Sequence, residues 1–121
     1  MRIGCDIVDL KRFATSVAKE AFVQKVFRDL EIEACRKKPN PVASFAARFA
    51  AKEAFVKALG TGLYTHGLGP TDVWVENLDS GRPVLKFTPK VAVLLAELNL
   101  KSAEVSLSHH GEYALATVLL F

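Results

Sequence analysis

The feature that most constrains this fold is a long helical pattern from Val42 to Leu59. It is rich in alanine, the residue with the highest helix propensity. A Pro39-Asn40-Pro41 stop precedes it, and Gly60 follows it as a predicted C-terminal cap. The chain has 121 residues, and domains typically run to about 100–150 residues. We therefore expect one domain over residues 1–121, with this helix as its longest element.

Hydrophobic periodicity places shorter elements on both sides of this helix. Strands are predicted over 2–10, 72–77, 84–87, 104–107 and 113–120. Further helices are predicted over 11–27, with an interruption, and over 29–38 and 90–98. Irregular structure is expected over 61–70, and a hairpin turn over 108–112. This order predicts an α+β domain in which a small antiparallel sheet packs against helices.

The long helix carries cations where apolar residues are expected. At about 100° per residue, Lys52 falls inside the apolar stripe and Arg48 falls beside it. A cation in such a stripe either extends its charged head to solvent or meets an anion. The first is the simple interpretation, and the alternative is an anionic ligand or a subunit interface. Glu53 and Lys57 lie together on the flank, where a surface ion pair between residues four apart is the simple interpretation.

Asp6 is unusual because aspartate is depleted in strand interiors, and its neighbours here are apolar. A buried carboxylate needs a metal or a cation as partner. Asp6 and Glu53, from separate elements, would suit Mg²⁺, which accepts phosphate oxygens as further ligands. The simpler alternative is an ion pair of Asp6 with Arg2 or Arg12.

Two other groups could contact a phosphate. His109 and His110 lie in the predicted hairpin turn, where a histidine is usually solvated but can donate to an anion near neutral pH. Gly60-Thr61-Gly62 could cradle a phosphate, although it lacks the full P-loop pattern and Gly60 is already explained as a cap.

Composition excludes several classes of protein. With 50% hydrophobic and 24% charged residues, the chain reads as a globular domain. No apolar stretch approaches the ~20 residues of a membrane span, and Asp6 interrupts any signal peptide, so we expect a cytoplasmic protein. Cys5 and Cys35 form no disulfide framework. The net charge of +3 permits nucleic acid, but the basic run at 36–38 is explained as a helix end.

Four motifs resemble those of the holo-[acyl-carrier-protein] synthases, a family of small 4′-phosphopantetheinyl transferases. In chain order they are Gly4-Cys5-Asp6-Ile7-Val8, the stretch from Arg48 to Gly62, Gly81-Arg82-Pro83, and Val105-Ser106-Leu107-Ser108-His109. They are similar to the G-x-D-I-V opening, the long signature, the G-[KR]-P turn and the closing V-S-[IL]-[ST]-H strand of the family. The match covers nearly the whole chain in the right order, which makes it specific.

The resemblance implies a reaction and a role for each matched residue. A serine of an acyl carrier protein would attack the β-phosphate of coenzyme A and release adenosine 3′,5′-bisphosphate. Asp6 and Glu53 would bind Mg²⁺, and Lys57 would lie at the reacting phosphate. The hypothesised base is Glu53 or a metal-bound water that it polarises. The residues implied for the coenzyme A site are Arg48, Lys52, Gly60, Arg82, Pro83 and His109.

The resemblance also implies partners. Arg12 would dock the acidic carrier protein, and Arg28 is a second candidate. Family members are homotrimers with active sites between subunits, which would account for cations in an apolar stripe. Two positions depart from the family pattern: Cys5 replaces what is usually threonine or isoleucine, and His110 follows His109, so that either imidazole could face the ligand. The competing interpretations are a small basic nucleic-acid-binding domain and a non-catalytic coenzyme A-binding subunit.

Overall fold

The computed structural model describes residues 1–60 and 67–121. The strands are β1 (Arg2–Asp9), β2 (Val73–Asn77), β3 (Pro83–Phe87), β4 (Ala103–His110) and β5 (Tyr113–Leu120). The helices are α1 (Leu10–Val17), α2 (Glu20–Val26), α3 (Asp29–Arg36), α4 (Pro41–Leu59) and α5 (Pro89–Glu97), with a 3₁₀ turn η2 (Pro70–Asp72). The α+β class and the antiparallel pairing predicted from the sequence are confirmed.

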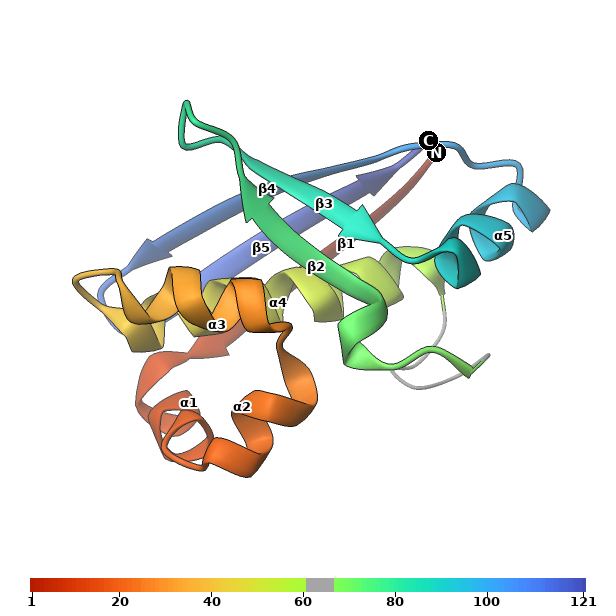
Figure 1. Ribbon diagram of the computed structural model, residues 1–121. Helices are drawn as coiled ribbons and strands as arrows, with labels where there is room; N and C mark the ends of the chain where they lie inside the picture. The colour runs from red at the N-terminus through yellow and green to blue at the C-terminus, as the bar shows by residue number, and fades with distance from the viewer. Residues whose placement is uncertain (61–66) are drawn as a thin grey trace.

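The described strands form two sheets rather than the single sheet expected. β1, β5 and β4 form an antiparallel sheet in that order, whereas β2 and β3 pair only with each other. In Figure 1 the β2–β3 hairpin crosses in front of the larger sheet, and the two chain termini lie together at the upper right. The pairing of Arg2 with Leu120 explains why the termini meet.

Helix α4 lies along one face of the three-stranded sheet and is buried on almost every side. Asn40 caps its start by accepting a hydrogen bond from the Ala43 amide, so Pro41 is the first residue of the helix and not part of a stop. Gly60 ends it at φ 81°, in the left-handed conformation expected of a C-terminal cap. Within the described residues, no helix is long and apolar enough to cross a membrane.

At Gly4 the strand β1 lies very close to helix α4. A Cβ atom added at Gly4 would lie 1.9 Å from the carbonyl oxygen of Ala54 and 2.7 Å from the amide nitrogen of Ala58. Since both are backbone atoms, only glycine allows the strand to lie this close to the helix. This contact brings Asp6, two residues further along β1, onto the face that α4 covers.

The opposite face of the three-stranded sheet is open in the single chain. Ile3 and Ile7 on β1 alternate with Gly4, Asp6 and Val8, so their side chains point away from α4. They are 69% and 62% exposed, and the exposed apolar side chains of β5 continue the same face. Exposed apolar side chains are thus gathered on the face of the sheet that α4 does not cover.

The β4–β5 hairpin is longer than the sequence predicted. His109 pairs with Ala114 and His110 with Tyr113, so both histidines belong to β4, and the turn is only Gly111-Glu112. Gly111 has φ 60°, which suits a two-residue turn and lets the strands pair up to it. The register places His109 on the same face as Ala114, towards α4, and His110 on the open face.

Candidate active site

Asp6 and Lys57 form an ion pair at the place where β1 and α4 meet. Lys57 Nζ lies 2.9 Å from Asp6 Oδ1 and also donates to the carbonyl oxygen of Cys5 at 3.1 Å. Asp6 raises the pKa of Lys57 through this hydrogen bond and through its charge. The alternative partner Arg2 donates instead to the carbonyl oxygen of Leu59. The unusual strand aspartate thus has its cation, and that cation comes from α4.

Glu53 lies one turn before Lys57 on α4 and is partly buried. Burial raises its pKa, the negative charge of Asp6 raises it further, and Lys57 opposes the increase. In the described part of the chain Lys57 bonds to Asp6 and not to Glu53. The simple interpretation of a Glu53–Lys57 surface pair is therefore wrong, and Lys57 pairs with the carboxylate of β1 instead.

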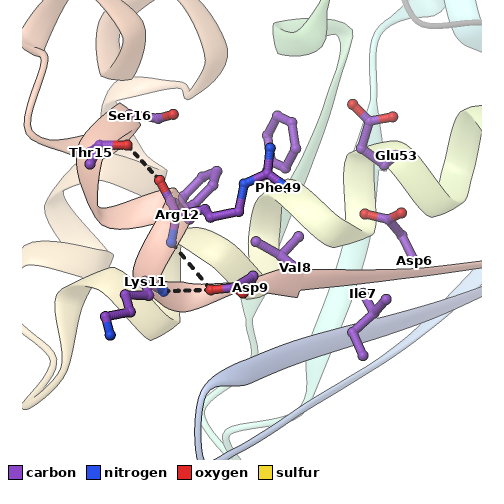
Figure 2. A pocket seen from close by; sticks show the side chains of 11 residues that line it. Asp6, Ile7, Val8, Asp9, Lys11, Arg12, Thr15, Ser16, Phe49 and Glu53 are labelled. Carbon is purple, nitrogen blue, oxygen red and sulfur yellow. Dashed lines mark hydrogen bonds between the residues drawn. The ribbon is translucent and has the colours of Figure 1, made fainter.

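A cleft of about 730 Å³ opens beside these carboxylates. Figure 2 shows Asp6 on β1, Glu53 on α4 and Arg12 on α1 along its border. Asp9 holds the first turn of α1 in place, since its Oδ1 accepts hydrogen bonds from the amides of Lys11 and Arg12. The cleft is thus lined by three carboxylates, those of Asp6, Asp9 and Glu53, and by the cations Lys11 and Arg12 of α1.

The donor chemistry of this cleft fits a hard divalent cation. Oxygen ligands are the kind that Mg²⁺ prefers, and it commonly keeps only one or two protein carboxylates. Asp6 and Glu53 supply two, and no group of three or more potential metal-ligating side chains occurs in the described residues. The remaining ligands would have to come from water or from phosphate oxygens.

Lys52 does not lie at this cleft. Its side chain is 2% exposed, and its Nζ donates to Glu31 Oε1 at 2.9 Å and to the carbonyl oxygens of Pro70 and Val73 at 2.8 and 2.6 Å. All three of its donors are used inside the protein. The predicted contact of Lys52 with coenzyme A is therefore wrong in this structure, and the anion that its place in the apolar stripe requires is Glu31.

Arg48 is also buried, at 4% exposure, but forms no ion pair with any residue that the structure describes. Its Nη2 donates to Asn77 Oδ1 at 2.7 Å, while its Nε has no hydrogen-bond partner among the described residues. Arg82 forms an exposed ion pair with Glu104, and Pro83 begins β3. The described lining of the cleft includes none of Arg48, Arg82, Pro83 and His109. Within one chain, the predicted site is thus divided into a carboxylate part at the cleft, with Asp6 and Glu53, and an arginine part away from it, with Arg48 and Arg82.

Two other predicted residues have structural partners. Arg28 donates from Nε to the carbonyl oxygen of Thr71 at 2.7 Å, and its guanidinium stacks 3.8 Å from the centre of the Trp74 ring. Gly60 caps α4, while the Thr61 and Gly62 of the proposed phosphate cradle lie outside the described residues.

Sequence reasoning did not single out Glu31 or Asn77. Glu31 lies among apolar residues of α3, which is a weak sign of burial, and Asn77 precedes a turn where asparagine is common. Neither signal points to a partner on α4.

Comparison with known proteins identifies the family. The family model described as the 4′-phosphopantetheinyl transferase superfamily matches residues 2–118. The chain belongs to this superfamily. Among curated members, the holo-[acyl-carrier-protein] synthase of Trichlorobacter lovleyi is 42% identical over 98% of this chain and 94% of its own length. That of Geotalea daltonii is 42% identical over 97% of this chain and 94% of its own length.

Solved structures of the superfamily have the same fold. The holo-[acyl-carrier-protein] synthase of Neisseria meningitidis matches with a TM-score of 0.88 at 30% identity, over 99% of this chain and 97% of its own. The enzyme of Helicobacter pylori, crystallised in complex with coenzyme A, matches with a TM-score of 0.85 at 29% identity, over 98% of this chain and 99% of its own. The resemblance inferred from the four motifs is thus confirmed.

Proposed function

We propose that this superfamily member transfers the 4′-phosphopantetheine arm of coenzyme A to a serine of an apo acyl carrier protein. The curated relatives carry the name of this activity, and the Helicobacter pylori structure holds coenzyme A. The observation that carries the proposal is the cleft at which Asp6 and Glu53 meet beside Lys57. These three residues are matched by the motifs of the family.

The reaction exchanges one phosphorus–oxygen bond for another. The serine Oγ forms a bond to the β-phosphorus of coenzyme A, and the bond from that phosphorus to the bridging oxygen breaks. Adenosine 3′,5′-bisphosphate leaves with that oxygen, and the serine proton must be removed. Catalysis of such a transfer rests mainly on positioning and on stabilisation of developing charge.

The residues of the cleft supply these functions. Asp6 and Glu53 would hold Mg²⁺, which when bound neutralises charge on the pyrophosphate and fixes the geometry of the transfer. Glu53 is the proposed acceptor of the serine proton, a role open to a partly buried carboxylate that borders the cleft. Lys57 Nζ, half-exposed beside Asp6, would stabilise the phosphate.

Arg12 is proposed to dock the carrier protein. It is exposed at the rim of the cleft, on a helix whose first turn Asp9 holds in place. An acidic carrier protein approaching this rim would bring its serine towards Glu53. We expect Arg12→Glu to raise the KM for carrier protein and to leave the affinity for coenzyme A unchanged. An equal loss for both substrates would contradict this assignment. Arg28 is a weaker candidate, since Thr71 and Trp74 engage its guanidinium.

A homotrimer with sites between subunits would reunite the two parts of the site. The open face of the sheet, with Ile3 and Ile7, offers an apolar surface for a neighbouring copy. A neighbour could then bring Arg48, Arg82 and His109 to the carboxylates that they do not reach within one chain. We expect this assembly to act in the cytoplasm.

Intact-mass spectrometry of an apo acyl carrier protein tests the function. The carrier is incubated with this protein, coenzyme A and Mg²⁺, with a chelator and a Glu53→Ala variant as controls. We expect a mass gain of one phosphopantetheine arm that is lost in both controls. Bound coenzyme A without any mass gain would indicate a non-catalytic binder, and neither binding nor gain would refute the proposal.

A further inference from the structure

Asn77, the last residue of β2, uses both ends of its amide group. Its Oδ1 accepts a hydrogen bond from Arg48 Nη2 at 2.7 Å, and its Nδ2 donates to the carbonyl oxygen of Gly81 at 3.0 Å. Asparagine has an acceptor and donors on one short side chain, which this double contact requires. The side chain therefore links α4 to the turn between β2 and β3.

The turn that Asn77 holds is closely defined. The Leu78 amide donates to the carbonyl oxygen of Arg82 at 2.9 Å, and the Gly81 amide donates to that of Leu78 at 2.8 Å. Gly81 has φ 91°, a conformation that glycine adopts most easily. Because Gly81 directly precedes Arg82, the bond from Asn77 to its carbonyl oxygen sets where the backbone of Arg82 lies relative to Arg48.

Arg48 carries an unbalanced charge. It is 4% exposed, its partners, the Asn77 amide and the Cys35 thiol, are neutral, and it forms no ion pair among the described residues. Its Nε is buried without a hydrogen-bond partner there. A buried cation without an anion is costly, so this guanidinium is suited to an anionic ligand. Lys52, four residues on, differs because Glu31 already neutralises it.

We propose that Asn77 is a positioning residue for the phosphates of coenzyme A. It fixes the separation and orientation of two arginines, Arg48 on α4 and Arg82 on the turn, without touching the ligand itself. The inference rests on the proposed function, which supplies the anion. It adds a residue outside the matched motifs and assigns it a role in coenzyme A binding and not in the proton transfer at Glu53.

Asn77→Ala and Asn77→Asp test the two halves of this link. Alanine removes both hydrogen bonds. Aspartate keeps the acceptor for Arg48 but pairs with its charge and places a carboxylate oxygen against the Gly81 carbonyl oxygen. We expect both variants to raise the Kd for adenosine 3′,5′-bisphosphate about tenfold, the effect of losing one hydrogen bond from the ligand to a guanidinium, which is no longer held in place in the alanine variant and is already neutralised in the aspartate variant. The KM for coenzyme A should rise similarly, and the KM for carrier protein should change less than twofold.

Thr88→Val is the matched control at the other end of the same hairpin. It removes one partly buried side-chain hydrogen bond, from Thr88 Oγ1 to Asp72 Oδ1 at 2.9 Å, and leaves Arg48 and Asn77 intact. Binding of the bisphosphate is measured by titration calorimetry, and each variant is first compared with wild type by thermal unfolding. If the role of Asn77 were purely structural, Thr88→Val would raise the Kd as much as an Asn77 variant with the same loss of stability.

The outcomes separate this inference from the function on which it rests. A tenfold rise in Kd for the Asn77 variants but not for Thr88→Val supports the inference. Equal Kd values in all variants overturn it, even if wild type converts the carrier protein. If wild type makes no holo carrier protein, the proposed function fails, and the calorimetric comparison still decides whether Asn77 positions an anion site.

Discussion

Replacing Gly4 with alanine tests the contact that brings β1 onto α4. The new Cβ would lie 1.9 Å from the Ala54 carbonyl oxygen, whereas an ordinary contact needs at least 3.4 Å. Strand and helix would have to separate by about 1.5 Å. Neither neighbour can rotate away, because both atoms belong to the helix backbone.

The cost follows from the buried surroundings. Overpacking typically costs about 1–3 kcal/mol and occasionally more, and a clash with helix backbone belongs at the upper end. We therefore expect a loss of about 3 kcal/mol in the free energy of unfolding, which corresponds to roughly 10–15 °C in Tm for a domain of this size. The displacement would also move Asp6 away from Lys57, so activity should fall even in the folded fraction.

Urea denaturation followed by circular dichroism measures this loss. Gly69→Ala is the control, since Gly69 has a φ of −112° and its added Cβ would meet nothing closer than Asp72 Oδ2 at 3.9 Å. We expect that control to change the free energy of unfolding by less than about 1 kcal/mol. A loss below about 1 kcal/mol for Gly4→Ala would refute the argument, because it would mean that β1 does not lie this close to α4.

Three further predictions concern buried or charged side chains. Lys52→Met should cost about 3–5 kcal/mol of unfolding free energy in urea, because Glu31 is left charged and buried without its partner; a loss below about 1 kcal/mol would show the pair to be dispensable. Glu53→Gln should unfold at a higher temperature than wild type at pH 7. The pKa of Glu53 is raised above 4.5 in the folded protein. Wild-type stability therefore falls as the pH rises above 4.5 and Glu53 loses its proton. Below that pH, the difference in unfolding temperature between the variant and wild type should vanish. Iodoacetamide at pH 8 should alkylate exposed Cys5 and leave Cys35, whose pKa burial raises to about 11; alkylation of Cys5 that did not slow with rising protein concentration would count against a covered sheet face.

Most helices and strands could be predicted from the sequence because they depend on residues that are close together in the chain. The apolar alternation of β1, the alanine content of α4 and the glycine after it act over a few residues, and the structure has all three. The prediction of where the β4–β5 hairpin turns was wrong, because strand pairing up to Gly111 depends on cross-strand register rather than on the residues of one strand.

The candidate site was predictable in its residue types and only partly in its geometry. A strand aspartate and a helix glutamate indicated a carboxylate site, and the family motifs named Asp6 and Glu53. That Lys57 pairs with Asp6 and not with Glu53 follows from the approach of β1 to α4 at Gly4, a contact between segments 51 residues apart in the chain. A helical wheel of α4 cannot show this contact, because it contains only the residues of that helix.

By itself, the sequence determined the helices and strands, the family, and the presence of two cations in the apolar stripe of the longest helix. Only the tertiary structure decided which cation is neutralised within the protein. Glu31, 21 residues before Lys52 in the chain, turns that lysine into a buried structural pair. Arg48, by contrast, has only neutral partners among the described residues, the amide of Asn77 and the thiol of Cys35. The physical reason is that neutralising a buried charge depends on which groups packing brings within hydrogen-bond distance, and packing is a property of the whole chain.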